Sequence, residues 1–181
     1  FEISVPVGWL ALRPNSEEFN AALEKEGAVN QMLHDEMIDD QSSSHAKRDR
    51  LYAYALRPDI RENVMLGFST LAWEPEDATP LDNAGMGKLV RDLEASGLIP
   101  GFRADTVQLH EDGSVKMIEI GGHWMMSDGE GGTIPFYSTI VFFKPTTGST
   151  TRVIFTFVED YHEQIYADIK SIMESIILIE Q

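Results

Sequence analysis

The sequence predicts an α+β domain in which helices cover the faces of an antiparallel β-sheet. Segments with strand-like alternation of apolar residues dominate the second half of the chain, and short turn-forming stretches separate them. Segments with apolar residues at helical spacing lie before, between and after these strands. Because a length of 181 residues suits one hydrophobic core, we expect residues 1–181 to form a single domain.

Two short strands and a helix are expected at the start of the chain. Apolar residues alternate over residues 1–7, and a second strand over 9–12 follows a turn. Asn15 and Glu18 have the spacing of a capping box, which predicts that a helix begins at this point. Gly27 is a plausible stop for that helix.

The next part of the chain returns from helix to strand. A second helical stretch over 29–37 is followed by a polar, serine-rich loop at 41–48. Strand patterns occupy 51–56 and 63–73, the latter apolar on both faces as in a central strand. The acidic, proline-bearing segment 74–80 is typical of a loop.

A helix and an antiparallel meander are expected next. The helix should end at Gly97 and cover the sheet with the apolar stripe formed by Met86, Leu89, Val90 and Leu93. Strands at 104–109 and 115–125 flank a turn at 111–113. Two more strands are expected at 135–143 and 152–158.

The last helix should complete the core. Asp160 followed by Glu163 predicts a capping box at its start, and Tyr161 with four isoleucines forms its apolar stripe. We expect the following residues to be buried together: Val64, Leu66, Phe68, Val141, Phe143, Phe155, Phe157, Ile165, Ile169 and Ile172.

Composition excludes several classes of function. With 30 acidic and 14 basic residues, the net charge of −16 disfavours binding to nucleic acid or to an anionic membrane surface. Without cysteine there can be no disulfide, thiolate nucleophile or cysteine-bound metal. No apolar run approaches the length of a membrane-spanning helix.

The sequence contains none of the spaced motifs that force a catalytic mechanism, so we predict no catalytic residues and no cofactor. The five histidines share no metal-ligand spacing. Asp35 with Asp39, and Glu36 with Asp40, fall one helical turn apart near His34 and could converge on a hard cation. A solvated acidic helix face explains the same residues, so no metal site is predicted.

The segment 121–128, GGHWMMSD, is the best candidate for a contact surface. Two glycines inside a strand often mark a bulge or a close backbone approach, and tryptophan and methionine suit adaptable contacts. The competing interpretation is that alternate apolar residues point into the core. The residues expected to bind a ligand or partner are His123, Trp124, Met126, Asp128 and Glu130.

The two ends of the chain resemble the PsbP-like fold, which includes the photosystem II protein PsbP and the Ran-binding protein Mog. Residues 1–9, FEISVPVGW, are similar to the opening pattern of that family. The strand 152–158, followed by a helix that ends near 175–177, is similar to its ending. The resemblance implies an α/β/α sandwich and a binding or assembly role without a shared catalytic apparatus. The acidic stretch 29–40 departs from the pattern.

The sequence therefore predicts a non-catalytic accessory protein that binds a protein or a small ligand. Because the chain begins at Phe1 already in strand pattern, we expect a leader upstream and an exported or lipid-anchored protein outside the cytoplasm, although a cytoplasmic location stays open. The alternatives are a hydrolase with a fold-assembled Ser, His and carboxylate site, and an acidic metal-binding module. An enzyme should hold titratable groups within hydrogen-bond reach in a deep pocket, whereas a binding module should show a shallow groove or patch.

Overall fold

The computed structural model describes residues 1–27, 34–35, 37–38, 52–55, 69–77, 79–111, 115–127, 129–144 and 149–179. The strands in this part of the chain are β1 (Trp9–Leu12), β2 (Tyr52–Ala55), β3 (Ser69–Asp77), β4 (Arg103–His110), β5 (Met117–Ser127), β6 (Thr133–Phe143) and β7 (Ser149–Val158). The helices are α1 (Glu17–Gly27), α4 (Asn83–Ser96), the 3₁₀ turn η1 (Glu159–Tyr161) and α5 (His162–Glu174).

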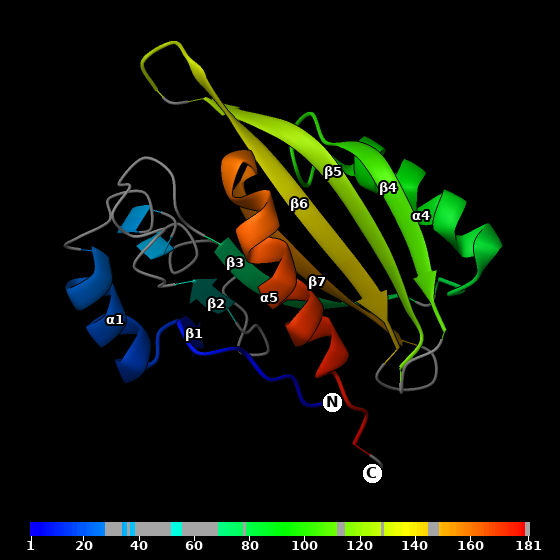
Figure 1. Ribbon diagram of the computed structural model, residues 1–181, viewed down its shortest axis with the longest axis horizontal. Coiled ribbons are helices and arrows are strands. Elements are labelled where there is room, and N and C mark those ends of the chain that lie inside the picture. Colours follow the sequence, from blue (N-terminus) through cyan, green and yellow to red (C-terminus); the bar gives the residue numbers. More distant parts are fainter. Residues whose placement is uncertain are drawn as a thin grey trace.

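All the described strands belong to one antiparallel sheet of seven strands in the order β1-β2-β3-β7-β6-β5-β4. Helix α5 crosses one face of this sheet, and α4 lies behind β4 and β5 on the other (Figure 1). The strands β6 and β7 are central and are largely buried. The predicted α+β class, with helices on both faces of an antiparallel sheet, is confirmed.

The face beneath α5 carries the largest apolar cluster. Alternate residues of β6 and β7 meet the isoleucine stripe of α5, and Ala53 and Ala55 of β2 extend the cluster toward the edge of the sheet. The predicted core residues Val141, Phe143, Phe155, Phe157, Ile165, Ile169 and Ile172 all belong to this cluster and are at most 1% exposed. Their predicted burial is confirmed, whereas Val64, Leu66 and Phe68 lie outside the described residues.

The opposite face is covered by α1 at one end and by α4 at the other. Phe19 of α1 packs with Tyr54 of β2, and Leu89 of α4 packs with residues of β5 and β6. Trp124 of β5 contacts both clusters and so joins them. Of the described helices, α1 and α4 therefore pack on this face and α5 packs on the other.

Helix α4 matches its predicted end and shows how its start is fixed. Gly97 adopts a left-handed conformation with φ of 66°, which closes the helix as expected. At the other end the Asp82 carboxylate accepts a hydrogen bond of 2.8 Å from the Gly85 amide.

The capping boxes predicted for the other helices are wrong. In α1 the cap is Ser16, whose Oγ accepts from the Phe19 amide at 3.0 Å, while Asn15 takes up a left-handed turn conformation. In α5 the residue before the helix is Tyr161, and no side chain caps the first turn, so Asp160 and Glu163 do not form the expected pair.

Two strand boundaries also differ from the prediction. Residues 1–7 form no strand, and their alternation reflects the packing of Phe1, Ile3 and Val5 against the α5 cluster, with one bridge from Glu2 to Ile177. The segment 74–77, predicted as loop, continues β3, because its main chain pairs with 149–152 of β7. Most of the helical stretch 29–37, the loop 41–48 and residues 63–68 lie outside the described residues.

The ring of Phe155 offers a direct test of the core. It is fully buried between β3, β6 and α5, so we expect Phe155→Ala to lower the free energy of unfolding by about 3–5 kcal/mol. Chemical denaturation measures this loss. Val7→Ala is the control, because Val7 is fully exposed and its truncation should change stability by less than about 0.5 kcal/mol. A loss below about 1 kcal/mol for Phe155→Ala would contradict the assigned packing.

Candidate functional site

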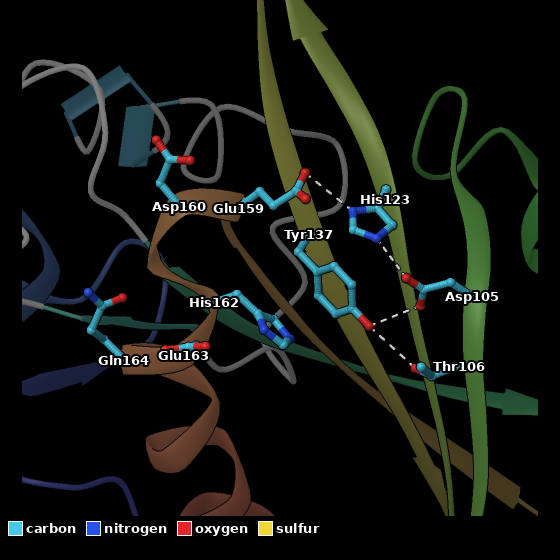
Figure 2. A pocket seen from close by; sticks show the side chains of 9 residues that line it. All are labelled: Asp105, Thr106, His123, Tyr137, Glu159, Asp160, His162, Glu163 and Gln164. Carbon is cyan, nitrogen blue, oxygen red and sulfur yellow. Dashed lines mark hydrogen bonds and ion pairs between the residues drawn. The ribbon is translucent and has the colours of Figure 1, made fainter.

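A pocket of about 530 Å³ opens where η1 and the start of α5 meet β4, β5 and β6. It lies on the α5 face of the sheet, beyond the region that the helix covers (Figure 2). Its lining residues are Asp105, Thr106, His123, Tyr137, Glu159, Asp160, His162, Glu163 and Gln164. Strands therefore form one wall, and the strand-to-helix connection forms the other.

A β-bulge in β4 brings two consecutive side chains into the pocket. Ala104 pairs with Gly122 and Thr106 with Gly121, so Asp105 is an extra residue between them. In a regular strand, neighbouring side chains point to opposite faces. Here Asp105 and Thr106 both line the pocket, because the bulge shifts the alternation by one residue.

Gly121 allows a tyrosine from β6 to reach across β5. A Cβ atom at position 121 would collide with the hydroxyl groups of Tyr137 and Thr106. Without that atom, the Tyr137 hydroxyl passes over β5 and donates to Asp105 Oδ1 at 3.1 Å. The prediction of a bulge or close approach at Gly121 and Gly122 is confirmed, since the bulge lies opposite these glycines and the Phe102 ring approaches Gly122 closely.

The hydrogen bonds around Tyr137 have defined directions. Its single proton is donated to Asp105, so the Thr106 hydroxyl must be the donor in the 3.3 Å contact with the Tyr137 oxygen. Burial is the main cause that raises the pKa of Tyr137 to about 12, and the nearby Asp105 carboxylate adds to the rise. Tyr137 therefore stays a neutral hydrogen-bond donor at physiological pH.

His123 is held between two carboxylates from different elements. Its Nε2 lies 2.6 Å from Asp105 Oδ2 in β4, and its Nδ1 lies 3.3 Å from Glu159 Oε2 in η1. All three side chains are about half exposed. Because ionised carboxylates only accept hydrogen bonds, both contacts form together only when both ring nitrogens carry protons. His123 thereby links the sheet to the start of α5 (Figure 2).

The 3₁₀ turn η1 and the first turn of α5 supply two more carboxylates to the same pocket. Asp160 and Glu163 line it, and no side chain caps the helix start. The imidazole of His162 lies against the ring of Tyr137, with centroids 4.6 Å apart. The pocket thus combines aromatic surface with four carboxyl groups.

A second polar cluster lies beside the pocket on the same face. Glu119 of β5 is 5% exposed and accepts hydrogen bonds from Tyr166 at 3.2 Å, while its other oxygen lies 2.8 Å from His110 Nε2. Burial, with the Glu119 charge, raises the pKa of Tyr166. The cluster therefore joins β4 and β5 to α5 through one buried carboxylate.

The structure separates the residues that the sequence suggested as a contact surface. His123 lines the pocket, whereas Trp124 and Met126 lie on the opposite face and pack near α1. The Trp124 indole donates to Ser138 Oγ at 3.0 Å, and its ring lies tilted against Phe136 with centroids 4.8 Å apart. Their roles in binding stay a prediction.

The remaining suggested residues belong to the turn between β5 and β6. Asp128 lies outside the described residues, and Glu130 is exposed. In Figure 1 this hairpin projects beyond the rest of the sheet. Met125, on the same strand face as His123, is 54% exposed.

Sequence reasoning missed most of the pocket. Asp105 and Tyr137 come from strands judged only by their apolar pattern, and no residue of β4 itself indicated that the bulge lies at Asp105. The sequence predicted Glu163 as part of a helix cap, whereas the structure places it in the pocket lining. The glycine pair at 121–122 was the available signal, because it marked the strand where other side chains approach closely.

The acidic stretch suggested as a metal module lies only in part within the described residues. Asp35 is exposed and contacts His34, with Nδ1 and Oδ1 3.1 Å apart, while Glu36, Asp39 and Asp40 lie outside the described residues. Within the described part of the chain, no three His, Asp or Glu side chains are placed to hold a metal ion. Also within that part, no helix is long and apolar enough to cross a membrane.

The role of Gly121 can be tested by adding one methyl group. Gly121→Ala should displace the Tyr137 hydroxyl and cost about 1–3 kcal/mol of stability, because the new Cβ overlaps two hydroxyl groups. Gly87→Ala in α4 is the control, since its nearest neighbour is Arg91 Nη1 at 3.4 Å and alanine favours the helix. Thermal unfolding of both variants gives the comparison. Equal stabilities would show that Tyr137 does not cross at this point.

The raised pKa of Tyr137 predicts a pH effect on stability. Below pH about 10 the phenol is neutral in both folded and unfolded chains, so its contribution is fully present. Between about 10 and about 12 the unfolded chain ionises first, and stability falls as the pH rises. The ultraviolet absorbance of tyrosinate, compared with Tyr137→Phe, should show one phenol that titrates near 12 and is lost in the variant. A difference spectrum with a midpoint near 10 would contradict this.

Comparisons with known proteins give distant likenesses. No protein-family model and no curated protein matches the sequence. A solved structure of PA94, a protein of unknown function from Pseudomonas aeruginosa, has 13% identity and a TM-score of 0.49 over 64% of this chain and 76% of that chain. LpqN, involved in cell envelope biogenesis of Mycobacterium tuberculosis, has 12% identity and a TM-score of 0.49 over 94% of this chain and 78% of that chain. At these values neither likeness says what this chain binds.

Proposed function

We propose that this chain is a non-catalytic accessory protein whose pocket binds the cationic group of a ligand or of a partner protein. The observation that carries the proposal is the charge of the pocket lining. Asp105, Glu159, Asp160 and Glu163 surround one cavity, and none of the nine lining residues is lysine or arginine. The net charge of −16 adds a long-range attraction for cations.

The expected affinity of one such contact is modest. Two opposite charges 4 Å apart attract by about 4 kcal/mol at an effective dielectric constant near 20. Exposed ion pairs are worth only about 0–1 kcal/mol, because water screens them. Since Asp105 and Glu159 are roughly half exposed, recognition should depend on several carboxylates together and should weaken as salt increases.

Aromatic rings beside the carboxylates support an organic cation. The rings of Tyr137 and His162 meet edge-on with centroids 4.6 Å apart, and the Phe157 ring lies 5.8 Å from that of Tyr137. An alkyl chain can lie along such rings, and an ammonium or guanidinium group gains about 0.5–1 kcal/mol near an exposed aromatic face. A carboxylate ligand would be repelled by the four carboxyl groups of the lining.

The hydrolase alternative receives less support, although the pocket does contain titratable groups within hydrogen-bond reach. Both ring nitrogens of His123 are within reach of carboxylates, so neither is directed at a nucleophile. None of the nine described lining residues is serine, and the Thr106 hydroxyl donates to Tyr137. Tyr137 itself has a pKa near 12 and is a poor nucleophile at neutral pH.

The finer points of the sequence prediction remain part of this proposal. These are a location outside the cytoplasm, by export or lipid anchoring, and a relationship to the PsbP and Mog proteins. A contribution of Trp124, Met126, Asp128 and Glu130 to binding a larger partner is also kept as a proposal. The exposed Met125 beside His123 is compatible with a partner that extends from the pocket toward the hairpin.

Titration with matched four-carbon probes tests the proposal. Putrescine should shift the NMR ring resonances of His123 and His162, whereas succinate and butanediol should not, because only putrescine is cationic. Glu163→Gln should weaken putrescine binding about twofold to fivefold by loss of one exposed ion pair. Glu174→Gln is the control, since Glu174 lies at the other end of α5 and is exposed. Equal shifts with putrescine and butanediol would overturn the proposal.

A further inference from the structure

We propose that the cation is the side chain of a lysine or arginine in an extended peptide, and that this peptide pairs with β4 as an added strand. This inference rests on the proposed function of the pocket and names the kind of partner that carries the charge. It joins two features that lie side by side: the acidic pocket, and the open edge of the sheet from which Asp105 and Thr106 enter it.

Strand β4 is the last strand of the sheet on this side. In the described part of the chain it pairs with β5 alone, so its outer edge presents main-chain donors and acceptors. At one end the edge is occupied, because the Ala104 amide donates to Glu94 Oε1 of α4 at 3.1 Å. From Thr106 to His110 the pairing with β5 is regular. This stretch is long enough for about five residues of a partner strand, or roughly 17 Å.

The two faces of this edge differ, and the difference predicts the peptide pattern. Thr106, Gln108 and His110 lie on the pocket face, whereas Val107 and Leu109 lie on the α4 face. Val107 is 39% exposed at the edge. A paired strand therefore places alternate side chains toward the pocket and toward Val107. We expect a basic residue on the pocket side with apolar residues before and after it.

The distances in a β-sheet allow a basic side chain to enter the pocket from this position. An added strand lies about 4.8 Å from β4, and residues directly opposite have Cβ atoms about 4.5–5.5 Å apart. A lysine or arginine opposite Thr106 would therefore lie beside the Asp105 carboxylate at the mouth of the pocket. Its stem would lie over Thr106, on the near side of the ion pair between Asp105 and His123, because His123 stands between Asp105 and Glu159.

Charge favours a basic peptide over a second copy of this chain. A copy would bring its own net charge of −16, and pairing β4 with β4 would bring two acidic pockets together. Charged residues and bulges at a sheet edge also discourage pairing of like edges, and β4 has Arg103 and the bulge at Asp105. A short basic strand avoids this repulsion, because its charge is complementary to the pocket.

Peptide pools provide the test. The probes are capped pentapeptides with random ends, a centre fixed as lysine, norleucine or glutamate, and neighbours fixed as valine or serine. Retention on the immobilised protein, measured by mass spectrometry, should be highest for the valine-lysine-valine pool, about tenfold above its norleucine counterpart. N-methylation of the amides beside the lysine should abolish the higher retention of the valine-lysine-valine pool, because it blocks strand pairing. Hydrogen exchange should show protection of amides between Thr106 and His110.

Two protein variants and the putrescine titration separate the possible failures. Asp105→Asn should reduce retention of the lysine pool, whereas Asp92→Asn on the exposed face of α4 should not. If putrescine binds while methylated and unmethylated peptides are retained equally, strand pairing is wrong and the pocket proposal stands. If putrescine binds and no lysine pool exceeds norleucine, the peptide partner is also wrong. If neither putrescine nor any lysine pool binds, the pocket proposal fails and this inference fails with it.

Discussion

One helix is too narrow to cover one face of a seven-stranded sheet, and among the described helices α5 alone packs on the pocket face, so the pocket lies where α5 does not reach. Seven strands spaced about 4.8 Å apart span roughly 29 Å, whereas a helix with its side chains is about 10–12 Å wide. On one face α1 and α4 together cover the sheet, whereas on the other face α5 covers the central strands. Beyond α5, the strands β4 and β5 carry polar residues on that face, and Asp105, Thr106 and His123 lie there.

The pocket is assembled at the boundary between the covered and uncovered parts of the sheet. Tyr137 comes from β6 at the edge of the apolar cluster, and it reaches outward over Gly121 to hydrogen-bond with Asp105. His123 reaches in the other direction, toward Glu159 at the start of the helix. These contacts satisfy polar groups that leave bulk water, which would otherwise cost free energy. They also fix the positions of the carboxylates that face the cavity.

Periodicity predicted the parts of the fold that burial determines, and failed where a local hydrogen bond decides. The alternation that places Phe155 and Ile169 in the core is a property of whole elements, so it survives small errors in their boundaries. A cap depends on one residue, and Ser16 rather than Asn15 accepts the bond in α1. Of the pocket, the sequence indicated His123 and a close approach at Gly121. The side chains that approach Gly121 come from the two strands that pair with β5. A single sequence does not show which strands will be neighbours in the sheet.

The bulge at Asp105 has opposite effects on the two sides of β4, and this bears on the choice of partner. Toward β5 it turns Asp105 and Thr106 into the pocket and sets Thr106, Gln108 and His110 on the polar face. Toward the open edge it interrupts the regular ladder, which makes indiscriminate pairing less favourable. A partner must then obtain part of its binding energy from side chains rather than from the main chain alone. The side-chain site beside the bulge is acidic, so a strand with a basic residue gains an attraction that an apolar strand lacks. The bulge at Asp105 therefore both makes binding specific for a basic strand and protects the edge from pairing with a second copy of the chain.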